Sequence, residues 1–230
     1  MGWKASTIII SNPTQVDNEK LLNDLGFSNL KKIEDEPFEV AINPDDNNVF
    51  IGTYKDNLLI CAPDIPMFFF EDDETQTEKI LIKAFPTSEI CSIVLHSGVN
   101  LWAYSVTKNG QKIRARAGSS DDGTFVEIGE PLEEEKELLS KSTLEKNGAR
   151  TYIFEETDDE PMTEDQVGEN FVFAICSRYF GEQLDQADDL LFETTLAGYS
   201  YSPKSTQKVT VQKTNLQQTA NDNKPWWKFW

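Results

Sequence analysis

The chain has 230 residues, of which 38% are hydrophobic and 11% are aromatic. This length fits one domain of roughly 200 residues with an appendage, and this hydrophobic content excludes a wholly disordered acidic protein. The formal net charge is -19, but residues 201–230 contain five lysines and one aspartate, so residues 1–200 carry -23. Because nucleic-acid binding requires neutralisation of phosphates, this charge argues against a DNA or RNA partner, and it fits either a basic partner or simple solubility.

The first half of the chain alternates short β-rich and helical patterns. Residues 5–11 are rich in β-branched side chains and predict a strand. Residues 14–25 predict a helix that ends at Gly26. Two apolar runs, 48–54 and 57–62, are separated by two residues, as in a β-hairpin. Residues 64–83 predict two short helices.

The segment 89–128 predicts a meander of antiparallel strands. Its four strand-like runs are separated by Gly-containing turns, which favour hairpins. Helices are expected at about 132–146 and, after a polar connector, at 163–184, where Thr163 and Asp165 are candidate N-caps. The sequence therefore predicts an α+β domain over 1–200, with a mainly antiparallel sheet packed by helices. A flexible polar linker over 201–225 and an aromatic motif over 226–230 complete the chain.

Several motifs resemble a bacterial family of unknown function. They are the opening Met-Gly-x-Lys, Val49-Phe-Ile-Gly-Thr-Tyr leading to Leu59-Ile-Cys, Leu95-His-Ser-Gly-Val-Asn-Leu-Trp-Ala-Tyr104, and Val126-Glu-Ile-Gly-Glu-Pro-Leu132. The resemblance covers about residues 1–200 and omits the C-terminal tail. It implies one domain in a bacterial cytoplasm, and it supplies no activity, cofactor or catalytic residue.

Cysteine usage and hydropathy also favour the cytoplasm. Cys61, Cys91 and Cys176 lie in apolar runs without C-x-x-C spacing, so we expect buried free thiols in a reducing compartment. No run approaches the roughly 18 apolar residues of a membrane span, and the first residues lack a secretory signal pattern. Gly2 and Ser6 formally match a myristoylation pattern, but the segment also fits the approach to the first strand.

His96 is the only histidine and the weak catalytic candidate of the chain. It ends a predicted strand, where it could present a general base to a cleft, or simply form a structural hydrogen bond beside the turn. The adjacent Ser97 is a poor nucleophile for it, because neighbouring strand residues point to opposite faces.

Arg114 and Arg116 are weak ligand-binding candidates. They alternate on one predicted strand and therefore share a face. Their guanidinium groups could grip an acidic ligand, or the pair could lie on an exposed face and neutralise nearby carboxylates.

We expect neither a metal nor a cofactor. One histidine and three scattered cysteines do not make a zinc site, and no glycine-rich phosphate loop is present. The paired aspartates lack calcium-loop order and fit solvated turns. These pairs are Asp45-Asp46, Asp72-Asp73, Asp121-Asp122 and Asp158-Asp159.

The last seven residues form a basic aromatic cluster behind the linker. Exposed apolar clusters mark contact sites, so we expect this cluster to dock on a partner or on the chain's own body. Weak contact with a membrane surface is the alternative. The docking candidates are Lys224, Trp226, Trp227, Lys228, Phe229 and Trp230.

The leading functional hypothesis is a non-enzymatic acidic interaction protein, immunity-like or adaptor, with a docking tail and a basic protein partner. It depends on the charge asymmetry, the tail and the scarcity of catalytic groups. One alternative is a hydrolase-like enzyme that uses His96 and carboxylates. The other is a peripheral membrane protein held by its Trp-rich end.

Overall fold

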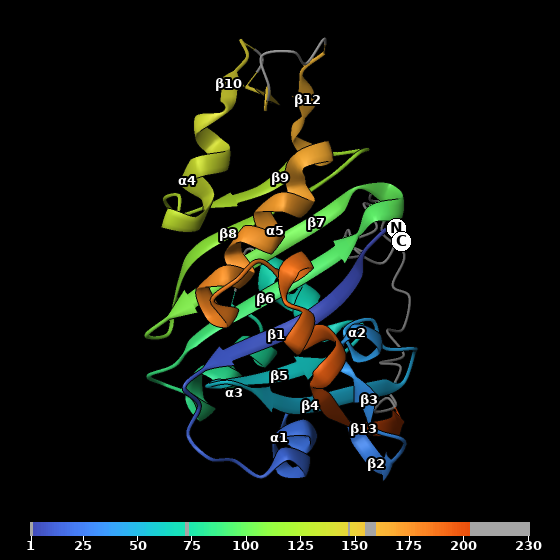
Figure 1. Ribbon diagram of the computed structural model, residues 1–230. Coiled ribbons are helices and arrows are strands. Elements are labelled where there is room, and N and C mark those ends of the chain that lie inside the picture. Colours follow the sequence, from blue (N-terminus) through green and yellow to red (C-terminus); the bar gives the residue numbers. More distant parts are fainter. Residues whose placement is uncertain (1, 72–73, 147, 155–159, 203–230) are drawn as a thin grey trace, which may run out of the picture.

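The computed structural model describes residues 2–71, 74–146, 148–154 and 160–202. They build a ten-stranded antiparallel sheet with helices on both faces (Figure 1). Its order is β2-β13-β4-β5-β1-β6-β7-β8-β9, and β3 pairs with β13. The strands are β1 Lys4–Ser11, β2 Ser28–Lys32, β3 Glu36–Pro37, β4 Asn48–Tyr54, β5 Asn57–Cys61, β6 Glu89–His96, β7 Leu101–Lys108, β8 Gln111–Ser119, β9 Gly123–Ile128 and β13 Thr195–Ser202.

Strand β1 joins the two halves of the sheet. Its Ile9 lies between Leu59 of the β4–β5 hairpin and Cys91 of the β6–β9 meander. Successive strand residues point to opposite faces, and Ile8, Ile9 and Ile10 are all fully buried. Both faces of the central sheet are therefore covered.

Each face carries its own helices. One face is covered by α1 (Asn18–Asp24), the 3-10 helix η1 (Ile65–Phe70) and α3 (Gln76–Ala84). The other is covered by α2 (Phe38–Ala41), α4 (Glu133–Ser140), α5 (Glu164–Phe180) and η4 (Asp189–Glu193). Two further 3-10 turns are η2 (Ser97–Val99) and η3 (Leu184–Gln186). Figure 1 shows α5 running across the meander.

Helix α5 is the main element on its face. A capping box between Thr163 and Gln166 begins it, and Gly181, with φ 83°, ends it. Its Gly168 packs directly on the ring of Trp102 in β7, since a Cβ added there would lie 2.0 Å from Trp102 Cδ1. This close approach sets the distance between α5 and the sheet.

The predicted α+β fold with a mainly antiparallel sheet is confirmed. The first strand, the hairpin, the meander, the two short helices and the long helix are all present, although α1 begins only at Asn18. The helix expected to 146 is wrong after Ser140, where the chain enters a small separate sheet. This small sheet consists of β10 (Ser142–Leu144), β11 (Arg150–Tyr152) and β12 (Met162–Thr163).

Strand β13 extends past the predicted start of the linker. Tyr201 and Ser202 belong to it, and the Tyr201 ring packs edge-on against Phe27 with centroids 4.6 Å apart. The remainder of the predicted linker and the aromatic motif at 226–230 lie outside the described residues.

The Gly168 contact generates a stability prediction. Alanine normally favours a helix interior over glycine by about 0.5–1 kcal/mol. Here the added methyl collides with buried Trp102, so we expect Gly168→Ala to lower the free energy of unfolding by about 1–3 kcal/mol. Urea unfolding measures this change.

The matched control is Asn170→Ala, an exposed position in the same helix, which should change stability by about 0.5 kcal/mol or less. A Gly168→Ala variant as stable as the wild type would show that α5 has room above Trp102.

Candidate functional site

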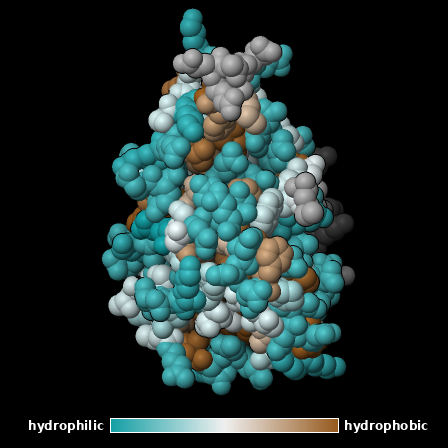
Figure 2. Space-filling view, in the orientation of Figure 1, coloured by the Kyte–Doolittle hydropathy of each residue, from teal (hydrophilic) through white to brown (hydrophobic). Residues whose placement is uncertain are grey.

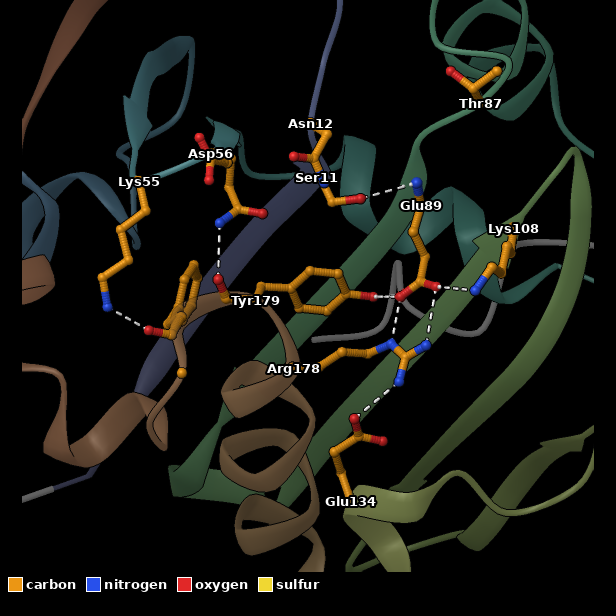
Figure 3. A pocket seen from close by; sticks show the side chains of 13 residues that line it. Ser11, Asn12, Lys55, Asp56, Thr87, Glu89, Lys108, Glu134, Arg178 and Tyr179 are labelled. Carbon is orange, nitrogen blue, oxygen red and sulfur yellow. Dashed lines mark hydrogen bonds and ion pairs between the residues drawn. The ribbon is translucent and has the colours of Figure 1, made fainter.

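An open cavity of about 860 Å³ lies at one end of the sheet, beside the C-terminal end of α5 (Figure 3). The ends of β1, β6 and β7, the β4–β5 turn, α4 and the end of α5 all contribute to it. Its lining is mostly polar and carries three basic and three acidic side chains. The lining residues are Ser11, Asn12, Lys55, Asp56, Asn57, Thr87, Glu89, Lys108, Glu134, Arg178, Tyr179, Phe180 and Gly181.

Glu89, the first residue of β6, is the centre of the hydrogen-bond network in this cavity. The Arg178 guanidinium contacts both of its carboxylate oxygens, with Nη2 3.0 Å from Oε2 and Nε bonded to Oε1. The Tyr179 hydroxyl donates to Oε1 at 2.9 Å, and Lys108 Nζ lies 3.5 Å from Oε2. Figure 3 shows all three groups converging on this carboxylate. A two-pronged arginine contact of this kind fixes direction as well as distance.

The surroundings keep Glu89 and Arg178 ionised. Burial raises the pKa of Glu89, but the hydrogen bonds from Arg178 and Tyr179, with the charges of Arg178 and Lys108, bring it below its usual value. The hydrogen bonds from Arg178 to Glu89 and Glu134 raise the arginine pKa further above its ordinary value, against the effect of burial. Groups that stay charged recognise charge and do not exchange protons near neutral pH.

Glu134 connects α4 to this network. Its Oε1 accepts from Arg178 Nη1 at 2.9 Å. Its Oε2 is buried and has no hydrogen-bond partner among the residues that the structure describes. A buried carboxylate oxygen without a donor is costly.

The end of α5 forms the opposite side of the cavity. Asn57 Nδ2 donates to the carbonyl of Tyr179 at 2.9 Å, and Lys55 Nζ donates to the carbonyl of Phe180. Lys55 also lies 3.8 Å from Glu182. The last carbonyls of a helix carry partial negative charge, which the Lys55 ammonium group offsets here.

The structure places His96 away from this cavity. It lies at the other end of β6 from Glu89, seven residues along the strand, or roughly 24 Å at ~3.4 Å per residue. His96 is half-buried, and its Nδ1 is buried without a partner in the described part of the chain. Ser97 instead accepts from the Trp3 backbone N–H at 2.7 Å and contacts the Glu169 carboxylate. The structure does not bring His96 to the cavity.

Arg114 and Arg116 share a face of β8 as predicted, but the exposed-face alternative is wrong, because each is only 1% exposed. Arg114 Nη2 lies 2.8 Å from Glu135 Oε1 in α4, and Arg116 pairs with Glu164 at the start of α5. Both sit under helices whose glutamates are distant in the sequence. They bind the protein's own carboxylates and hold α4 and α5 to the sheet.

The other candidate residues separate into two groups. Asp45, Asp46, Asp121 and Asp122 are exposed turn residues. The pairs Asp72-Asp73 and Asp158-Asp159, and the tail residues from Lys224 to Trp230, lie outside the described residues. Sequence reasoning missed Glu89, Glu134 and Arg178, whose only signal was the presence of charges beside apolar runs.

A second surface, at the small sheet, exposes large hydrophobic side chains. Figure 2 shows a mostly hydrophilic face with scattered hydrophobic patches, one of which lies at the top of the view, towards the small sheet. Leu144 is 61% exposed, Ile153 51% and Met162 37%. Among the described residues, no helix is long and apolar enough to cross a membrane.

The fold and cavity define an α+β protein with a charged site at its strand ends. Residues 13–143 match a family of unknown function, DUF6928, and the chain belongs to this family. The predicted resemblance is thus confirmed over a shorter range, which includes Glu89, Lys108 and Glu134 but not Arg178. A search of the curated proteins finds no match, and neither does a search of the solved structures.

The depressed pKa of Glu89 generates a pH prediction. A carboxylate whose folded-state pKa is lowered stabilises the protein above its unfolded pKa of about 4.3, and this contribution is lost as the pH falls through the folded pKa. We expect Glu89→Gln to cost roughly 2–3 kcal/mol at pH 7, with the difference from wild type shrinking below about pH 4. Urea unfolding at several pH values measures it.

Glu133→Gln is the control, since the Glu133 side chain is 80% exposed and pairs with the exposed Lys136. It should change stability little at either pH. A Glu89→Gln deficit that is the same at pH 3 and pH 7 would contradict an ionised Glu89.

Proposed function

We propose that the protein is a non-enzymatic interaction protein that binds a basic protein partner through the cavity around Glu89 and Arg178, in the manner of an immunity protein or an adaptor. The observation that carries the proposal is the ionised network in this cavity, which holds charges in place without a group poised to transfer a proton. Preformed charges of this kind give a binding site direction and specificity.

The charge of the body favours a cationic partner. Residues 1–200 carry a formal charge of -23, so the field around them attracts basic proteins and repels acidic ones. Such long-range attraction mainly raises the association rate. The final orientation then depends on the local groups of the cavity.

Two local features would receive a lysine or arginine of the partner. Glu134 Oε2 has no donor among the described residues, and Asp56 is an exposed carboxylate of the lining. The basic lining residues already have acceptors, because Arg178 is held by two glutamates and Lys55 by Phe180 and Glu182. Among the described residues of the cavity, the groups that can still form a hydrogen bond with a partner are therefore acceptors.

The setting of this protein would be the bacterial cytoplasm, where its three buried free thiols would remain reduced. The aromatic tail would serve as a separate docking element. The hydrolase alternative has no comparable support, since His96 is not among the residues that line this cavity.

The test compares two substitutions that remove the same charge from adjacent residues. Glu134→Gln changes the cavity, whereas Glu133→Gln changes an exposed carboxylate outside it. Each tagged full-length protein is cross-linked in cells that produce it, and the affinity of each captured protein is then measured by calorimetry. We expect a lysine- or arginine-rich partner whose affinity falls about fivefold or more with Glu134→Gln, as the loss of about 1 kcal/mol implies.

With Glu133→Gln the affinity should stay within about twofold of wild type. Equal binding by both variants, or a captured partner of acidic character, would contradict the cavity as the binding site.

A further inference from the structure

An apolar groove of about 230 Å³ lies between α1 and the end of α3. Its apolar wall consists of Val16, Leu21 and Ala84, and Val16 and Ala84 are only half-buried. Two exposed aspartates, Asp17 and Asp24, line the groove together with Lys20, which is also exposed. The groove therefore combines an apolar wall with a rim of net negative charge.

The described chain ends beside this helix. Ser202 pairs with Ser28 at the start of β2, only four residues after α1 ends at Asp24. The packing of Tyr201 on Phe27 fixes this end of β13 against the same region. The 28 residues that follow Ser202 thus begin next to α1.

We propose that this groove is the docking site of the chain's own C-terminal residues 224–230, with one tryptophan on the apolar wall and the lysines beside Asp17 and Asp24. The inference goes beyond the binding cavity, because it concerns a different surface and a different occupant. It assigns the aromatic tail an intramolecular contact.

The length of the intervening chain is sufficient. The 22 residues from Ser202 to Lys224 have a root-mean-square span of about 25 Å if they behave as a polar coil. Four residues from Asp24 to Ser28 cover at most about 14 Å, and paired strands lie about 5 Å apart. The tail can therefore reach the groove without being stretched.

Charge and chemistry also match. Residues 201–230 carry a formal charge of +4 against -23 for the remainder of the chain. One aspartate of the rim, Asp24, is partly neutralised by Lys20 at 3.0 Å, whereas the Asp17 side chain accepts from the Lys20 backbone N–H. A buried tryptophan removes about 150–250 Å² from water, which makes it an effective anchor for a small groove.

Tethering lowers the affinity that the contact needs. A short flexible linker gives an effective concentration in the millimolar range, so an interaction of about millimolar strength already fills the groove half of the time. A small groove is adequate for such an affinity.

Hydrogen exchange of full-length proteins tests this docking. The tail variant carries Trp226→Ser, Trp227→Ser and Trp230→Ser. Its matched control carries Val209→Ser, Val211→Ser and Leu216→Ser, which remove three apolar residues of the linker. We expect amides in residues 13–25 to exchange about twofold faster or more in the tail variant, and at the wild-type rate in the control.

A second pair of variants tests the groove itself. Asp24→Lys reverses a charge that lines the groove, and Glu19→Lys reverses an exposed charge elsewhere on α1. Only in the Asp24→Lys background should the three tail substitutions lose their effect on exchange.

Three results would overturn the proposal. The first is an unchanged exchange rate in residues 13–25, and the second is a change confined to another surface, such as the small sheet with Leu144 and Met162. The third is tryptophan-dependent co-sedimentation with vesicles of phosphatidylglycerol and phosphatidylcholine without any change in α1, which would make the tail a membrane contact instead.

Discussion

Ion pairs fix helix α5 to the sheet at both of its ends, and the rest of the site depends on this arrangement. Near the N-terminal end Glu164 pairs with Arg116 of β8, and near the C-terminal end Arg178 pairs with Glu89 of β6. Between them Gly168 rests on Trp102. Buried charges lose hydration when the protein folds, so such pairs contribute modestly to net stability but strongly disfavour any arrangement that leaves one charge alone. The helix therefore has one position along the sheet.

The position of α5 on the sheet forms one side of the cavity and brings the charged side chains of its lining together. With α5 held by Glu89, the second arginine contact reaches Glu134 and draws the start of α4 into the same network. The next residue of α4, Glu135, binds Arg114, and Arg116 Cζ lies 4.6 Å from the Phe171 ring centroid. Four glutamates and three arginines thus connect two helices to two strands, β6 and β8. The cavity remains where these elements diverge at the strand ends.

Local sequence patterns predicted the fold well where the sequence of an element itself contains turn or capping residues that mark its ends. The β4–β5 hairpin and the β6–β9 meander have two- to four-residue polar turns between apolar runs, and α5 has both an N-cap and a terminating glycine. Strand β13 was missed because its sequence, with Gly198 and alternating serines, lacks a continuous apolar run. Its position is instead decided by neighbours, since a Cβ on Gly198 would lie 2.3 Å from the Glu34 carbonyl oxygen.

Local sequence patterns predicted little of the candidate site. Period-two alternation correctly placed Arg114 and Arg116 on one face, but their burial depends on glutamates that lie 11 to 48 residues away. Glu89 and Arg178 are 89 residues apart, and neither belongs to a motif that marks it. Only the tertiary fold brings them together.

The central claim is that the Glu89–Arg178 pair holds the end of α5 in place. A double-mutant cycle with Glu89→Gln, Arg178→Met and the double variant, measured by urea unfolding at pH 7, tests it most directly. The account predicts a coupling free energy of about 1–3 kcal/mol, with the double variant less destabilised than the sum of the single ones. A coupling close to zero would show that the two residues act independently and that the pair does not position the helix.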